Sequence, residues 1–134
     1  MSRQNVNTVR RLFEYWERGE WRASAELFHP EFEAIFSAGA FPDPGTYHGA
    51  RSTLDAWRQW LDAWEEFSLE LEDAIPAGDE KVVVLNRLRG RGKASGIAID
   101  SEVGCIFELD GGRIVRMTFC DRRQALEAAR SGGG

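Results

Sequence analysis

The segment IAIDSEVGCIFELDGGRIVRMTFC, residues 97–120, determines the predicted fold because apolar and polar side chains alternate on both sides of a glycine-rich turn. Such alternation is typical of β-strands that bury one face. The Asp-Gly-Gly sequence at 110–112 is a strong signal for a hairpin. One face of the first strand carries the apolar residues Ile97, Ile99, Val103, Cys105, Phe107 and Leu109. The other face carries Asp100, Glu102, Gly104, Ile106 and Glu108. We expect the apolar face to pack against helices.

Further strands are predicted upstream of this hairpin. KVVVLNRLRGRG (81–92) directly precedes it, and FSLELEDAI (67–75) comes before the turn AGDE. The apolar face of 67–75 carries Phe67, Leu69, Leu71 and Ile75. Together these segments form an antiparallel meander of four strands. EFEAIF (31–36) predicts one brief strand more, and the Gly- and Pro-rich segment 37–49 predicts a loop.

Apolar residues at helical spacing predict three helices before the meander. The first helix carries its stripe on Val6, Val9, Phe13 and Trp16 and ends at Gly19. A short second helix covers 21–28. The third, from about residue 50 to 64, has its stripe on Ala50, Leu54, Trp57, Leu61 and Trp64. This order predicts one α+β domain over residues 1–130, with helices packed on one face of a curved sheet and a disordered tail at 131–134.

Composition excludes several classes of partner. The chain has 134 residues and a formal charge of −5, and its arginines are spread along the sequence. Nucleic-acid binding needs a concentrated basic face, so we expect no nucleic-acid partner. No apolar stretch reaches the length of a membrane span, and the first residues lack the apolar core of a signal peptide, so we expect a cytoplasmic protein without a membrane partner.

The cysteines and histidines do not predict a metal site. Cys105 and Cys120 form no CxxC motif, and His29 and His48 do not complete a zinc-ligand spacing with them. In a reducing compartment the two cysteines are interpreted as small buried apolar side chains. We expect no metal and no cofactor.

Asp121 stands where the last predicted strand gives way to a short helix, DRRQALEAAR (121–130). Asp121 followed three residues later by Gln124 is the pattern of a capping box. The Asp121 carboxylate would then accept from backbone N–H groups of the first turn, which stabilises a helix by about 1 kcal/mol. We therefore interpret Asp121 as a cap and not as a catalytic acid.

Five segments in this order resemble the nuclear transport factor 2-like superfamily, and within it the SnoaL-like branch. They are LFEYWERGEW (12–21), GTYHGARSTLDAW (45–57), LRGRGKASGIAID (88–100), DGGRIVRM (110–117) and DRRQALEAA (121–129). The resemblance implies a cone-shaped α+β barrel, with three N-terminal helices packed on a curved, mainly antiparallel sheet. It also implies an apolar pocket and a homodimer. It does not imply one reaction, because this fold serves isomerases, polyketide cyclases, hydrolases, dehydratases and non-catalytic modules.

The catalytic groups of two enzyme types in this superfamily are missing from the matching positions. For a ketosteroid-isomerase-like reaction, the tyrosine position is Leu12, the base falls near Ile35 or Phe36, and the protonated acid falls near Val103 or Gly104. For a limonene-epoxide-hydrolase-like reaction, the last-strand acid falls near Phe119. The Arg-x-Asp pair of that reaction is replaced by the sequence Arg87-Leu88-Arg89.

A polyketide-cyclase-like reaction needs one acid–base group in a pocket, and its candidates are Glu102, Asp100, Asp121 and His48. Glu102 is the weaker candidate because it faces away from the apolar side. Arg87, which shares its parity with Val83 and Leu85, would need an acid such as Glu33 or Asp43, or an anionic ligand, if that face is interior.

The candidate catalytic residues are Arg87, His48 and Tyr15. The candidate pocket residues are Trp16, Phe28, Phe36, Trp57, Trp60, Val103, Cys105 and Phe107. Two functions remain open. One is a pocket protein that binds a small apolar molecule, with isomerase, cyclase or hydrolase activity that needs no cofactor. The other is a non-catalytic dimeric module that binds a ligand or a protein.

Overall fold

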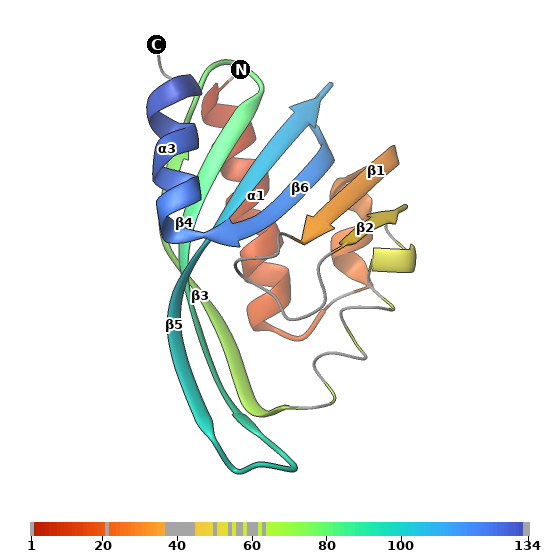
Figure 1. Cartoon of the computed structure of the whole chain (residues 1–134). Helices are drawn as coiled ribbons and strands as arrows, with labels where there is room; N and C mark the ends of the chain where they lie inside the picture. The colour runs from red at the N-terminus through yellow and green to blue at the C-terminus, as the bar shows by residue number, and fades with distance from the viewer. Residues whose placement is uncertain are drawn as a thin grey trace.

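The computed structural model describes residues 2–20, 22–36, 45–49, 51–53, 55, 58, 62 and 64–132. Most of these residues form a sheet of six strands and the helices on its two faces (Figure 1). The helices are α1 (Ser2–Glu17), the 3-10 helix η1 (Ala23–Leu27) and α3 (Arg122–Gly132). The strands are β1 (Phe28–Phe36), β2 (Gly45–His48), β3 (Trp64–Pro76), β4 (Lys81–Gly92), β5 (Ala98–Asp110) and β6 (Arg113–Asp121).

The strand order in the sheet is β2-β1-β6-β5-β4-β3. Strands β3 to β6 form the predicted antiparallel meander, and β1 joins it in parallel with β6. Gly111 and Gly112 take positive φ angles of 61° and 83° in the β5–β6 turn, as the Asp-Gly-Gly signal predicts. Strands β2 and β3 are the two edges, so the described sheet is mixed and open and does not close into a barrel.

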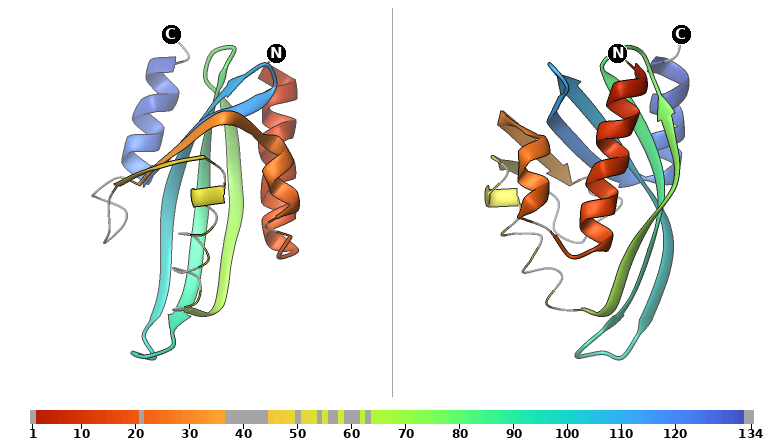
Figure 2. Two further views of the ribbon diagram at one scale, coloured as in Figure 1. Left: turned by 90° about the vertical axis from the view of Figure 1, so that its right-hand side faces the viewer. Right: turned by 180° about the vertical axis from the view of Figure 1, so that it is seen from behind.

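Helices cover both faces of the sheet, which corrects the prediction that they pack on one face. Figure 2 shows α1 and α3 on opposite sides of the strands. We call the face that carries α1 the inner face and the face that carries α3 the outer face. The sequence signal for two covered faces is the unbroken apolar run from Val82 to Leu85, because strands buried on both sides lose their alternation. Val82 and Val84 belong to the inner core, and Val83 and Leu85 belong to the outer one.

The first helix forms as predicted. Val9, Leu12, Phe13 and Trp16 on one side of α1 are buried, and Gly19 follows the helix with a φ of 73°. The Gly19 N–H donates to the carbonyl of Trp16, which closes the last turn. At the other end, the Asn5 side-chain amide donates to the Asp79 carbonyl at 2.7 Å and ties α1 to the β3–β4 turn.

Four local predictions need correction or lie partly outside the described residues. The second helix is a 3-10 helix, and residues 45–48 of the predicted loop form β2, paired with β1. In the predicted third helix, residues 51–53, 55 and 58 are helical, but Trp64 already belongs to β3. Residues 37–44 and the other positions of that helix lie outside the described residues. Helix α3 runs to Gly132, into the segment predicted as a tail.

Strand β3 contains two irregularities in its pairing with β4. The first lies between Glu65 and Ser68, where Glu66 has a φ of 53° that non-glycine residues rarely adopt. The second lies between Leu71 and Asp73. Beyond it the alternation is reversed, so Ala74 packs in the inner core and Ile75 in the outer one. The prediction that Ile75 shares a face with Leu71 is therefore wrong.

Candidate functional site

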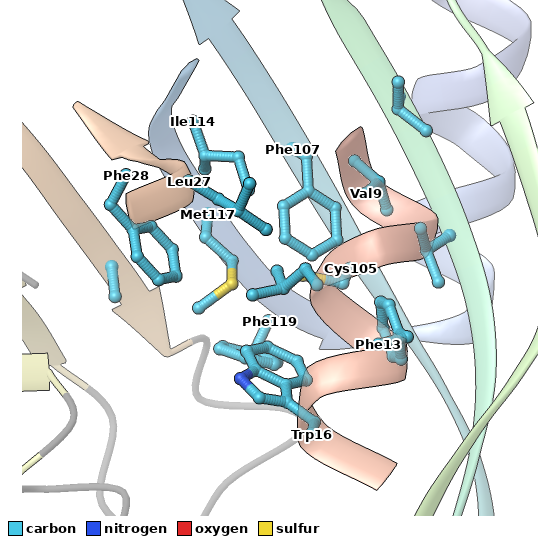
Figure 3. Close-up of a cluster of buried hydrophobic side chains, with 14 of the residues drawn as sticks. Val9, Phe13, Trp16, Leu27, Phe28, Cys105, Phe107, Ile114, Met117 and Phe119 are labelled. Carbon is cyan, nitrogen blue, oxygen red and sulfur yellow. The ribbon is translucent and has the colours of Figure 1, made fainter. Parts of the chain in front are cut away.

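The inner face of the sheet holds the main core under α1. Phe13 and Phe107 meet edge to face with ring centroids 6.2 Å apart, and Phe36 stacks on Phe119 at 4.9 Å. Figure 3 shows side chains from α1, β5 and β6 pointing toward one another in this cluster. Cys105 and Phe107 are fully buried there. This part of the inner face is a packed core.

The strands continue beyond the C-terminal end of α1 (Figure 1). The inner-face side chains near and beyond this end are mostly apolar, and we call the apolar ones the inner strip: Phe67, Leu69, Leu88, Ile99 and Val103. The exception on β5 is Ser101, an exposed residue that pairs with Leu88. Leu69 and Leu88 are buried, but Phe67, Ile99 and Val103 are only half-buried. The inner strip therefore keeps apolar surface within reach of solvent.

The first irregularity of β3 shapes the end of the inner strip. The extra residue at Glu66 lets Trp64 and Phe67 share the inner face with Leu69. A Cβ placed on Gly90 would lie 3.4 Å from the Trp64 ring and 3.5 Å from the Phe67 ring. Both rings thus pack directly over the Gly90 backbone.

Asn86 is the polar exception on the inner face of β4. It is fully buried and shares its parity with Val84 and Leu88. It pairs with Leu71 on β3 and with Val103 on β5, so its neighbours in the sheet are apolar. Neither its Nδ2 nor its Oδ1 atom has a hydrogen-bond partner among the described residues. A buried amide without partners costs about 1–3 kcal/mol, so such a group calls for an explanation.

The described candidate pocket residues lie on the inner side. Trp16, Phe28, Phe36, Cys105 and Phe107 are buried members of the main core, and Val103 belongs to the inner strip. Trp57 and Trp60 lie outside the described residues.

Arg87 lies on the outer face, opposite the inner strip. Its Nε donates to Asp100 Oδ1 at 2.6 Å, and its side chain is 34% exposed. The expected acid partners were Glu33 and Asp43, but Glu33 pairs with Arg116 at 2.6 Å, and Asp43 lies outside the described residues. The hydrogen bond from Arg87 lowers the pKa of Asp100, and Asp100 raises the pKa of Arg87. Arg87 is therefore a surface cation with a local partner.

Tyr15 and His48 lie on different elements, and neither belongs to the inner strip. The Tyr15 hydroxyl donates to Glu26 Oε1 at 2.6 Å between α1 and η1. His48 is exposed on edge strand β2, with its Nδ1 3.7 Å from Glu33 on the outer face. The three candidate catalytic residues thus occupy separate places in the described part of the chain.

The capping role of Asp121 is confirmed. Asp121 Oδ1 accepts from the Gln124 N–H at 2.8 Å, and Gln124 Oε1 accepts from the Asp121 N–H at 3.2 Å. These reciprocal bonds are the capping box.

Glu102 lies on the outer face as predicted, 3.4 Å from Arg122.

The model of the SnoaL-like domain matches residues 9–117. This chain belongs to the SnoaL-like family. No functionally curated protein matches it by sequence. The structure neighbours are members of the wider nuclear transport factor 2-like superfamily, as the resemblance predicts.

Three solved structures illustrate this relationship. An NTF2-like protein from Burkholderia thailandensis has a TM-score of 0.81 and 22% identity, covering 94% of this chain and 96% of its own. A protein from Jannaschia sp., provisionally described as a SnoaL-like polyketide cyclase, has a TM-score of 0.75 and 24% identity over 96% and 92% of the two chains. A Bacillus subtilis protein provisionally described as an isomerase has a TM-score of 0.74 and 17% identity over 97% and 94%. At these identities the likeness shows the fold alone.

The two cysteines of this SnoaL-like protein are poorly suited to catalysis. Burial raises the pKa of the Cys120 thiol to about 11 and that of Cys105 well above its usual value, so neither thiol is a ready nucleophile. Within the described ranges, no group of His, Cys, Asp and Glu side chains could hold a metal ion. No helix among the described residues is long and apolar enough to cross a membrane. One surface depression is lined by Gly19, Glu20, Arg22, Ala23 and Arg58.

The sequence contained a signal for Asn86 that the prediction did not use. In KVVVLNRLRG the alternation that assigns Val82, Val84 and Leu88 to one face also assigns Asn86 to it. A single amide in an apolar row is an exception to the strand pattern. Its lack of partners, however, becomes visible only in three dimensions.

Proposed function

We propose that this SnoaL-like protein binds a small, largely apolar molecule against the inner strip, within the cone-shaped interior that the family resemblance implies. The observation that supports this function is the incomplete burial of Phe67, Ile99 and Val103 on the inner face. Apolar side chains that remain reachable beside a packed core are typical of ligand sites. A polyketide, the substrate class in the description of the Jannaschia protein, would suit such a surface.

Binding is favoured over acid–base turnover by the positions of the candidate catalytic groups. Arg87 and His48 lie on the outer face, and Tyr15 donates its hydroxyl to Glu26. General acid–base catalysis requires such groups within hydrogen-bond reach of the ligand. We therefore propose a binding protein, with cofactor-free isomerisation, cyclisation or hydrolysis as the activities to assay once a ligand is known.

The test uses N-phenyl-1-naphthylamine, a neutral apolar probe whose emission rises in apolar surroundings. The wild-type protein should bind it saturably, and Ile99→Glu should weaken the binding about tenfold or more because a charge would enter an apolar site. Ile97→Glu is the matched control, since Ile97 is 65% exposed just before β5. Arg87→Ala and His48→Ala should bind as the wild type does.

Two results would contradict the proposal. One is the absence of saturable binding by a wild-type protein whose near-ultraviolet circular dichroism shows a folded state. The other is equal binding by Ile99→Glu and Ile97→Glu. Loss of binding in Arg87→Ala would instead indicate that the binding site lies on the outer face.

We also propose that the protein is a homodimer, as the family resemblance implies. The outer face supports this because charges of both signs lie side by side on it, including Arg89 between Glu70 and Asp100. Such a surface can match a second copy of itself across a two-fold axis. Sedimentation equilibrium tests the proposal, and a monomer at micromolar concentration would contradict it.

A further inference from the structure

Asn86 lies at the junction between the main core and the inner strip. In the sheet it is surrounded by Val84, Leu88, Leu71 and Val103, and its side chain is fully buried. Buried asparagines normally satisfy both their amide donors and their carbonyl acceptor. Here both Nδ2 and Oδ1 lack a partner among the described residues.

Asn5 shows what a satisfied buried asparagine looks like in the same protein. Asn5 is 5% exposed, and its Nδ2 donates to the Asp79 carbonyl at 2.7 Å. That bond joins α1 to the β3–β4 turn, so Asn5 has a structural role. Asn86 joins no two elements through its side chain, and a leucine would fit an apolar row better. Its amide is therefore suited to a group that the protein does not itself provide.

The residues around Asn86 also indicate the charge of a ligand group that could bind beside it. The inner positions of β4 and β5 are occupied by neutral residues, because the alternation places Arg87, Arg89, Asp100 and Glu102 on the outer face. An ionised ligand group beside Asn86 would be buried without a counter-charge on these strands, which is strongly unfavourable. A ligand group beside Asn86 would therefore be neutral.

We infer that Asn86 is the polar anchor for a neutral, carbonyl-bearing ligand with a hydrogen-bond donor next to the carbonyl. This inference rests on the proposed function and specifies its ligand class. Nδ2 donates to the ligand carbonyl, and Oδ1 accepts from the neighbouring donor. Amides, lactams and the enol forms of 1,3-dicarbonyl compounds present this pair of groups. The apolar remainder of the ligand lies along the inner strip.

The binding experiment compares 2-naphthamide, naphthalene and 2-naphthoate, which share one ring system. The wild-type protein should prefer 2-naphthamide over naphthalene by about tenfold, the value expected for a pair of hydrogen bonds to a buried amide. The 2-naphthoate anion should bind more weakly than 2-naphthamide. In Asn86→Leu the preference for the amide should disappear while naphthalene still binds.

Nuclear magnetic resonance provides a readout in the unmodified protein. The side-chain NH₂ signals of Asn86, assigned by their loss in Asn86→Leu, should shift when 2-naphthamide is added and much less with naphthalene. The signals of Asn5 should stay in place, because its amide is already bonded to Asp79. This measurement does not depend on the stability of any variant.

Stability without ligand gives an independent test. Asn86→Leu should raise the urea midpoint, because it replaces an unpaired buried amide with an apolar side chain of similar shape, whereas Asn5→Leu should lower it. If Asn86→Leu lowers the midpoint as Asn5→Leu does, the Asn86 amide is already bonded and the inference is overturned. Equal binding of naphthalene and 2-naphthamide would overturn it too, but the proposed function would stand. If none of the three compounds nor the naphthylamine probe binds, the proposed function itself fails.

Discussion

Replacement of Gly104 by alanine should disturb the packing of α3 on the sheet and lower the stability of the protein. Gly104 is buried on the outer face of β5, where α3 crosses it. A Cβ at this position would lie 2.4 Å from the Ala125 Cβ and 2.9 Å from the Asp121 carbonyl oxygen. Carbon atoms in contact prefer a separation of about 3.5–4.0 Å, so the helix would have to retreat by roughly 1 Å or more.

The size of the effect follows from these two contacts. Overpacking a core typically destabilises a protein by about 1–3 kcal/mol, and we expect the upper end here because one of the obstructing atoms belongs to the backbone. Ala125→Gly in the same chain removes the shorter contact, although a glycine inside a helix costs about 1 kcal/mol. The double variant should therefore lose less stability than the two single variants together.

Urea unfolding followed by circular dichroism measures these differences. Gly45→Ala is the matched control, because nothing lies within 4 Å of a Cβ at that position. It should change the stability by no more than about 0.5 kcal/mol. If Gly104→Ala behaves like Gly45→Ala, or if the effects of Gly104→Ala and Ala125→Gly simply add, close packing of α3 on Gly104 does not determine the stability.

Three further predictions concern single sites. Glu66→Gly should stabilise the protein by about 1 kcal/mol in urea unfolding, because glycine adopts the φ of 53° without strain. Asp100→Asn should be less stable than the wild type at neutral pH. Because Arg87 lowers the pKa of Asp100 below 3.8, this difference should persist down to about that pH, fade as the pH falls further through the folded-state pKa, and shrink in high salt. Cys105 and Cys120, whose pKa values burial raises, should react with iodoacetamide at pH 8 far more slowly in the folded protein than in 8 M urea; equal rates would contradict their burial.

Local patterns predicted much of this fold because the physics behind them is local. The period of two in 97–120, the Asp-Gly-Gly turn and the Asp121 capping box involve residues that are close in sequence. The same holds for α1, whose apolar stripe and Gly19 cap are both contained in a short segment. Such features depend on residues that are close in sequence, so the sequence alone predicts them.

The errors arose where distant segments decide the outcome. Residues 45–48 become a strand because β1 lies beside them, although Gly and Pro dominate that part of the sequence. A pairing irregularity after Leu71 reverses the side-chain alternation of β3, and no local signal marks it. Arg87 was difficult to place because its face of β4 is apolar at Val83 and Leu85, under α3, and charged further along.

The lengths of the elements explain why part of the inner face extends beyond the end of α1. Helix α1 has 16 residues and is about 24 Å long, whereas β5 has 13 residues and spans about 43 Å. A helix packed along these strands from the β3–β4 turn leaves nearly half of their inner face beyond its end. If this remainder were polar, it would need no explanation beyond being the solvent-exposed end of a long hairpin. It is mostly apolar but incompletely buried at Phe67, Ile99 and Val103, and the Asn86 amide, where the packed core ends, has no hydrogen-bond partner among the described residues. A core selected for stability alone would bury those side chains and omit the amide, so this combination supports the proposed binding of a small molecule.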